Sequence, residues 1–165
     1  MSYNYFFKGG FNNSYFFETG DGVVYEITFK PTPYLFGTEK IIFSDLIFEF
    51  SILVEFNPNK ELPATDHKIG ATSANIFNNF YLKKGNAVTV YICDSSDDKQ
   101  SIRKRKFDIW FSKYNDVKFF KIDKTLVDKN KKRFPISLIL LDSNPFKIEI
   151  INSFTSLIAD NNNDK

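Results

Sequence analysis

The 165-residue sequence has one cysteine and one histidine, and it has no apolar run long enough to cross a membrane. A lone cysteine, Cys93, excludes an internal disulfide and agrees with a reducing cytoplasm, where we expect the protein to reside. The first residues, MSYNYFFKGGFNN, lack the basic start and long apolar core of a signal peptide. The single histidine, His67, has no second histidine to support it, which argues against a serine or cysteine catalytic triad.

Nucleotide-binding and metal-binding motifs are also missing. Neither G-x-x-x-x-G-K-[ST] nor a strand-linked G-x-G-x-x-G occurs. Asp94, Asp97 and Asp98 could offer oxygen ligands to Mg²⁺, but no glutamate or histidine stands near them to complete the shell. The E-x-K strand signature of one class of metal-dependent nuclease is absent as well. We therefore expect no bound metal and no cofactor, and a nuclease ranks third among the functions considered.

Charge is distributed unevenly along the chain. Of the 22 basic and 20 acidic residues, seven basic and twelve acidic ones lie in residues 1–98, so the remainder of the chain carries fifteen and eight. The total of +2 thus hides an acidic first part and a basic C-terminal half. Such asymmetry indicates either an anion-facing surface, for a nucleic acid or an acidic protein partner, or an ordinary solvated face.

Apolar periodicity predicts a mixed architecture. Alternating residues indicate strands, and apolar residues three and four apart indicate helices. The predicted fold class is therefore α+β, an N-terminal antiparallel meander followed by helix, strand, helix, two strands and helix. These elements are expected to form one domain over residues 1–159, with a disordered tail at 160–165. The expected elements are a hairpin over 14–29, a bent strand over 41–56, a helix from Asp66 to just before Gly85, a strand over 87–93, a helix over 97–114 capped by Ser95 or Ser96, strands over 117–123 and 134–141, and a helix from residue 145.

The stretch YICDSSDDKQSIRKRKFDIWF, residues 91–111, joins a buried strand to a basic helix. Its aspartate-rich turn follows a strand end, where sheets with helical crossovers often carry functional side chains. Its four consecutive basic residues would cover about 300° of a helix, so some must lie beside the sheet. An internal network of aspartates and arginines is the structural alternative to an anion-binding site. The candidate ligand-binding residues are Asp94, Asp97, Gln100, Arg103 and Arg105.

The same stretch resembles a small uncharacterised bacterial family of unknown function. The family core reads Y-x-C-D-S-x-D-x-x-x-x-x-R-x-R-x-F-x-x-W-F, and the sequence also shares YEITF near its start and SNPF near its end. This resemblance brings no established activity. The residues that match the core are Tyr91, Cys93, Asp94, Ser95, Asp97, Arg103, Arg105, Phe107, Trp110 and Phe111.

The order of elements is also similar to the later part of the acetyl-CoA-dependent N-acetyltransferase fold. In that family a Q/R-x-x-G-x-G/A loop opens the helix after the meander and holds pyrophosphate with its backbone amides. The corresponding stretch here is HKIGAT, which keeps Gly70 and differs at His67 and Thr72. Under this alternative, Lys68 and Gly70 would bind the cofactor of a reduced acyl-CoA-dependent N-acyltransferase.

Two functional hypotheses follow from these observations. The first is a non-catalytic binding or regulatory module, in a toxin–antitoxin or phage-defence setting, that acts through the strand–helix junction and the basic C-terminal half on a protein or nucleic-acid partner. The second is the acyltransferase-like enzyme. The sequence has no recognisable nucleophile, general base or complete metal set, which favours the first hypothesis.

Overall fold

The computed structural model describes residues 1–59, 66–93, 99–116 and 118–163. In these ranges the chain forms seven strands, three α-helices and one 3-10 turn, η1 (Ser44–Leu46). The strands are β1 (Tyr5–Gly9), β2 (Ser14–Glu18), β3 (Val24–Pro31), β4 (Ile47–Phe56), β5 (Val88–Ile92), β6 (Phe119–Val127) and β7 (Arg133–Leu141). The helices are α1 (His67–Lys83), α2 (Gln100–Tyr114) and α3 (Lys147–Asn163).

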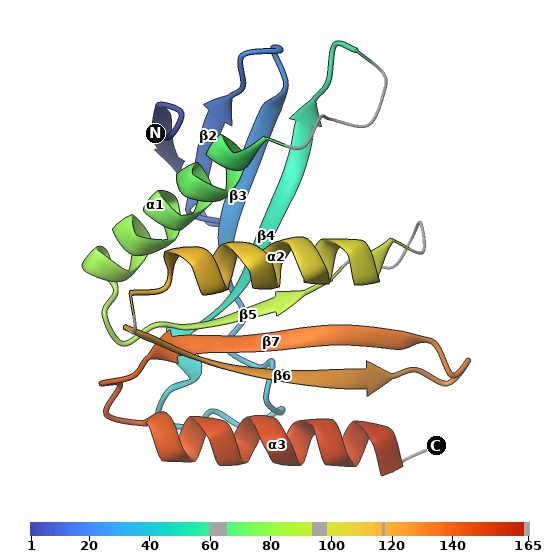
Figure 1. The fold of residues 1–165 in the computed structure, drawn as a ribbon. Coiled ribbons are helices and arrows are strands. Elements are labelled where there is room, and N and C mark those ends of the chain that lie inside the picture. Colours follow the sequence, from blue (N-terminus) through green and yellow to red (C-terminus); the bar gives the residue numbers. More distant parts are fainter. Residues whose placement is uncertain (60–65, 94–98, 117, 164–165) are drawn as a thin grey trace.

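All seven strands belong to one sheet, in the order β1-β2-β3-β4-β5-β7-β6 (Figure 1). Neighbouring strands are antiparallel except for β4 and β5, which are parallel and are connected through α1. The predicted α+β class, with an antiparallel meander followed by alternating helices and strands, is confirmed.

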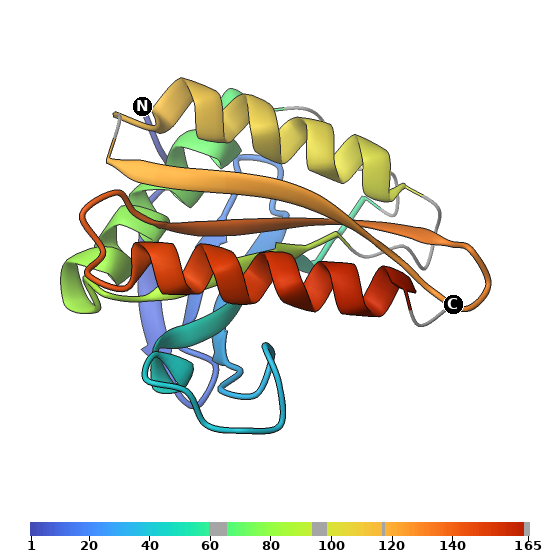
Figure 2. The same cartoon turned by 90° about the horizontal axis from the view of Figure 1, so that it is seen from below.

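Helices cover both faces of the sheet. Helices α1 and α2 lie on one face, and α3 lies on the other face over β5, β7 and β6 (Figures 1 and 2). Each face therefore has its own apolar core. The larger core is rich in aromatic rings, and the Phe29 ring from β3 stacks on the Phe80 ring from α1 at 3.8 Å between centroids. The smaller core packs α3 through Ile150, Phe154 and Ile158.

Several expected boundaries were wrong. Strand β1 was not expected, and residues 41–46 contain η1 instead of the first part of a strand. Helix α2 begins at Gln100 with Lys99 as its N-cap residue, later than the predicted start at residue 97. Ser95 and Ser96, the predicted caps, lie outside the described residues. Helix α3 continues to Asn163, so residues 160–163, which were expected in a disordered tail, are helical. Asn162 explains this extension in part, because its side chain donates to Thr125 O and accepts from Val127 N in β6.

Candidate binding site

The parallel strands β4 and β5 separate soon after they begin. They pair over four residues, from Ile47 opposite Val88 to Phe50 opposite Tyr91. Strand β4 then continues for six residues to Phe56, and no strand within the described ranges pairs with this part on the β5 side. In open sheets, ligands commonly bind beyond the carboxyl ends of parallel strands where the chain connections diverge. A ligand-binding site is therefore expected around this opening.

An apolar cleft lies beside the opening, between α1 and α2. Its volume is about 50 Å³, whereas one water needs roughly 10–15 Å³ by the same kind of measure. The cleft has room for a few small groups but not for a drug-sized molecule. The aromatic rings that line it belong to Phe50, Phe77, Phe107, Trp110, Phe111, Tyr114 and Phe119.

Gly70, a cofactor-binding candidate of the acyltransferase hypothesis, lies in α1 directly beneath the Trp110 ring of α2. A Cβ atom added to it would stand 2.6 Å from Cδ1 and 2.7 Å from Nε1 of Trp110. Real Cβ atoms essentially never come within 3.0 Å of another heavy atom, so only glycine fits beneath this ring in its present position. The glycine therefore has a packing role that does not depend on any cofactor.

The N-terminus of α1 is already occupied by a carboxylate. The Asp66 side chain accepts a hydrogen bond from Lys68 N at 2.8 Å and caps the helix as its sequence position predicts. The hydroxyl of Tyr3 donates to the other oxygen of the same carboxylate. These two hydrogen bonds, that of Tyr3 first, lower the pKa of Asp66. The Lys68 ammonium lies 5.4 Å from the centre of the Tyr3 ring. A pyrophosphate at this helix end would be repelled by the Asp66 carboxylate. The backbone amide of Lys68 is also unavailable to it, because this amide already donates to Asp66.

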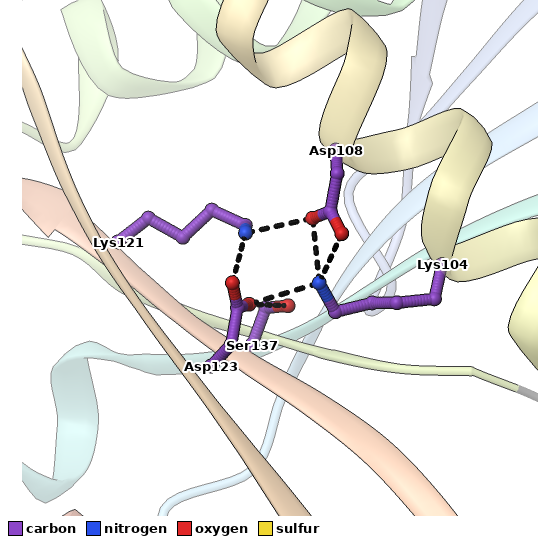
Figure 3. Close-up of polar contacts among 5 residues, drawn as sticks. All are labelled: Lys104, Asp108, Lys121, Asp123 and Ser137. Carbon is purple, nitrogen blue, oxygen red and sulfur yellow. Dashed lines mark hydrogen bonds and ion pairs between the residues drawn. The ribbon is translucent and has the colours of Figure 1, made fainter.

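Four charged side chains form a closed network between α2 and the sheet (Figure 3). Nζ of Lys104 lies 2.6 Å from Oδ1 of Asp108 and 3.1 Å from Oδ1 of Asp123. Nζ of Lys121 lies 2.7 Å from Asp108 and 2.6 Å from Asp123. The hydroxyl of Ser137, which is fully buried in β7, donates to Asp123 at 2.7 Å. Each ammonium thus lies between two carboxylates, and the network ties α2 to β6 and β7.

The ionisation states of this network follow from its contacts. Burial lowers the pKa of Lys104, but hydrogen bonds to Asp108 and Asp123 outweigh this effect and raise its pKa overall. Burial raises the pKa of Asp123, but hydrogen bonds from Lys121, Ser137 and Lys104 outweigh it and lower the pKa overall. Lys104 is therefore a charged ammonium and Asp123 a charged carboxylate at neutral pH. Lys104 is not a neutral amine ready to act as a nucleophile.

Cys93 and Tyr91 at the end of β5 are not reactive groups. The Cys93 side chain is 1% exposed, and desolvation is the largest influence on its pKa, which is raised. Burial also raises the pKa of Tyr91. A thiol of raised pKa holds little of the thiolate that a nucleophile or metal ligand requires. Among the described residues, no three histidine, cysteine, aspartate or glutamate side chains gather as metal ligands would.

The two arginine candidates of the strand–helix junction do not form one cluster, because they lie on different sides of α2. Asp94 and Asp97 lie outside the described residues. Arg103 is half-buried and has an interaction partner, whereas Arg105 is exposed on a different side of α2. Gln100 is the first residue of α2, and its Oε1 is buried without a hydrogen-bond partner among the described residues. This orphaned acceptor is the kind of group that a ligand donor could satisfy.

Exposed cations from two distant segments lie at one end of the molecule. The first half of α2 and the turn between β6 and β7 both lie at the end where β5 finishes (Figures 1 and 2). None of these cations forms an ion pair with a described residue. Of the acidic residues here, Asp128 hydrogen-bonds the backbone of its own turn and Asp160 is exposed. We call this surface the basic end, and its residues are Arg105, Lys106, Lys129, Lys131 and Arg133.

Comparison with known proteins gives a family but no activity. Residues 65–156, more than half of the chain, match the model of a family of unknown function, DUF6169. The chain belongs to this family. No curated protein and no solved structure matches it. The DUF6169 match spans both helices of the apolar cleft, the charged network and the basic end, and it leaves strands β1 to β4 outside. None of the helices in the described ranges is both long and apolar enough for a membrane span.

The network residues Lys104, Asp108, Lys121, Asp123 and Ser137 were not selected from the sequence, although a signal was present. Lys104 and Asp108 are four apart, and they share the helix face of Phe107 and Phe111 at spacings of three, four and seven. That face is the one that packs on the sheet, which places Lys104 against it. In β6, Lys121 and Asp123 share one face of the strand because they are two residues apart.

Proposed function

We propose that this DUF6169 protein is a non-catalytic binding and regulatory module whose basic end contacts the phosphate backbone of a nucleic acid. The observation that carries the proposal is the convergence of exposed cations, from α2 and from the β6–β7 turn, that form no ion pair with any described residue. Lysine and arginine side chains that neutralise phosphates release condensed counterions, and this release supplies most of the affinity for nucleic-acid backbones.

The composition of the basic end favours a nucleic acid over an acidic protein. Three of its five cations are lysines, and lysine is depleted in protein–protein interfaces, whose centres are rich in aromatic residues. The exposed aromatic rings of the described chain, those of Phe6, Phe7, Phe11, Tyr34 and Phe56, all belong to its first 56 residues. Backbone contacts without stacking rings predict binding with little sequence preference.

The proposed module is non-catalytic because the polar groups near the end of β5 do not form a reactive set. The lysines and aspartates of the charged network neutralise one another, and the one thiol is buried with a raised pKa. No described side chain there combines a nucleophile with a general base. A toxin–antitoxin or phage-defence role in the cytoplasm is part of the proposal, and it is supported only by the resemblance of the sequence.

A binding assay with a matched charge control tests the proposal. Fluorescence anisotropy with labelled single-stranded and double-stranded oligonucleotides of mixed sequence would measure the affinity of the wild type at 50 mM salt. The double variant Arg105→Glu/Lys129→Glu, which takes one cation from each segment, should bind at least tenfold more weakly. The control Lys30→Glu/Lys40→Glu changes the net charge equally, outside the basic end, and should bind within about threefold of the wild type.

Two results would count against this reading of the basic end. Equal losses in both double variants would mean that net charge alone governs binding. The wild type could instead bind neither oligonucleotide and bind an acidic polypeptide such as poly-glutamate. That result would mean that the partner of the basic end is an acidic protein.

The acyl-CoA hypothesis is the second candidate, and it is favoured by the sheet. The antiparallel meander, the parallel β4–β5 pair and the opening beside an apolar cleft fit the architecture of the N-acetyltransferase fold. The Asp66 carboxylate at the start of α1 and the Trp110 ring over Gly70 oppose it. A ligand at 100 times its dissociation constant should stabilise the protein by about 2.7 kcal/mol. Trp110 is the only tryptophan, so a CoA ester in the cleft should also change the intrinsic fluorescence. Millimolar acetyl-CoA that changes neither the melting temperature nor the fluorescence would eliminate this candidate.

A further inference from the structure

The two outer strands of the sheet differ sharply in how their edges are protected. Exposed strand edges tend to pair with other chains, and proteins usually protect them with charges, bulges or covering segments. Strand β6 carries Lys121, Asp123 and Lys124, and Asn162 of α3 hydrogen-bonds the backbone of Thr125 and Val127. This edge is closed to further pairing.

Strand β1, at the opposite edge, has little of this protection. Its backbone pairs with β2, and no hydrogen bond from any other described residue reaches it. Phe6 is 61% exposed and Phe7 48% exposed, and Phe11 in the following turn is 74% exposed. Lys8 is the one charged residue of the strand, and a register shift between Phe7 and Gly9 ends the regular pairing there. A second cation, the Lys83 ammonium of α1, lies 4.3 Å from the centre of the Phe7 ring. The edge is otherwise apolar, which is a feature of interaction surfaces.

The aromatic side chains of this edge form rows that a second copy would continue. The Phe6 ring stacks on Phe16 of β2 at 5.5 Å, on the face away from α1. On the other face, Phe7 packs on Tyr15 at 4.7 Å, and Tyr5 packs on the same ring at 6.2 Å. An antiparallel pairing centred on Phe6 would place Phe6 opposite Phe6 and Tyr5 opposite Phe7 of the other copy, because a two-fold axis relates the two strands. Directly opposite aromatic pairs stabilise such strands.

We propose that the protein forms a symmetric dimer in which the β1 strands of two copies pair antiparallel with Phe6 on the two-fold axis. A second copy fits this edge because the register is self-complementary, with each exposed ring of the regular segment opposite another ring. The two sheets then join into one continuous sheet across the dimer.

The area of the contact sets its expected strength. An aromatic side chain has about 150–250 Å² to bury, so the exposed parts of Phe6, Phe7 and Phe11 amount to roughly 350 Å² per copy. Two copies, with the strand backbones added, approach the lower limit of roughly 1,200 Å² for stable interfaces. A contact of this size lies at the weak end of specific interfaces, so we expect a reversible, concentration-dependent dimer.

The dimer and the basic end are independent of one another. Strand β1 is the first strand of the sheet and β6 the last, so pairing through β1 leaves the β6–β7 turn of each copy accessible (Figure 1). Loss of nucleic-acid binding would therefore say nothing about dimerisation, and loss of dimerisation would leave the basic end in place.

Sedimentation equilibrium of the purified protein, over 1–500 µM, tests the proposal. The wild type should move from 19.2 kDa toward twice that mass, and Phe6→Lys should stay monomeric at every concentration. Tyr34, which is 61% exposed like Phe6, supplies the matched control, and Tyr34→Lys should dimerise like the wild type. A wild type that stays monomeric at 500 µM overturns the proposal, as does a Phe6→Lys variant that dimerises normally.

A cysteine at the proposed two-fold axis gives a second, independent measurement. Opposite residues of paired strands have Cβ atoms about 4.5–5.5 Å apart, close to the separation that a disulfide needs. Phe6→Cys should therefore form a disulfide-linked dimer under mild oxidation, whereas Tyr34→Cys should not, and the native Cys93 is buried. This result decides the question even if Phe6→Lys fails to fold. Equal crosslinking of both cysteine variants, or of neither, would exclude the proposed register.

Discussion

Replacing Gly70 with alanine tests whether this glycine is present for helix packing. In an ordinary helix interior the change stabilises a protein, because alanine is favoured over glycine by about 0.8–1 kcal/mol. Here the new methyl group would stand 2.6 Å from the Trp110 ring, and overpacking of this kind costs about 1–3 kcal/mol. The difference between these two figures is a net loss of up to about 2 kcal/mol in the free energy of unfolding. The packing therefore offsets or reverses the gain that helix propensity alone predicts.

The sign should change again when the ring is removed. In a Trp110→Ala background the added methyl group has space, so Gly70→Ala should stabilise the protein by up to about 1 kcal/mol. The coupling between the two substitutions should thus be about 1–3 kcal/mol, within the range seen for side chains in contact.

Urea unfolding followed by circular dichroism measures all four proteins with one probe, and the midpoints and slopes give the free energies. A Gly70→Ala variant that is more stable than the wild type would refute the packing argument. So would additive effects of the two substitutions. Either result would mean that α1 and α2 do not meet closely at Gly70, and the glycine would again be available for a role in cofactor binding.

Two further predictions concern the charged groups. Lys104→Met leaves two carboxylates to share one lysine and should lower the free energy of unfolding by about 1–2 kcal/mol. The loss is smaller than for a fully buried ion pair because both carboxylates are partly exposed. Lys106→Met, exposed on the same helix, should change it by less than about 0.5 kcal/mol, and equal effects would contradict the network. Asp66→Asn keeps a capping side chain but removes the carboxylate whose pKa is lowered, mainly by Tyr3. A lowered pKa stabilises the fold above the unfolded value of about 3.9, so the wild type should exceed Asp66→Asn in urea midpoint at pH 7. This difference should disappear as the pH falls through the lowered pKa, and a difference that persists at pH 2 would contradict the assigned hydrogen bonds.

Local patterns predicted most of the elements. Alternation in Val23, Tyr25, Ile27 and Phe29 indicated the strand that became β3, and Asp66 indicated the start of α1. Both signals are local, since they depend on side-chain period and on a cap. Strand β1 was missed because Tyr5, Phe6 and Phe7 are apolar on both faces and two glycines follow. Its alternation becomes visible only after β2 defines which face is buried.

The arrangement of the sheet and the location of the charges depend on contacts between distant residues. The separation of β4 from β5 after Phe50 depends on pairing between segments about forty residues apart, and no local pattern specifies it. In α2, four adjacent cations surround most of the helix, so charge alone does not predict which of them faces the sheet. Phe107 and Phe111 fix the rotation, and they turn Lys104 toward the sheet while Arg105 faces solvent. The partner of that lysine on β6 could not be known before the strand order was.

The salt dependence of nucleic-acid binding tests the central claim most directly. The logarithm of the binding constant should fall linearly with the logarithm of the salt concentration, with a slope of about −0.9 for each phosphate contacted on a duplex. The Arg105→Glu/Lys129→Glu variant should have a slope shallower by about 2, because two contacts are lost, while Lys30→Glu/Lys40→Glu should keep the wild-type slope. A wild-type slope near zero, or the same slope in all three proteins, would contradict the assignment of the basic end as a phosphate-binding surface.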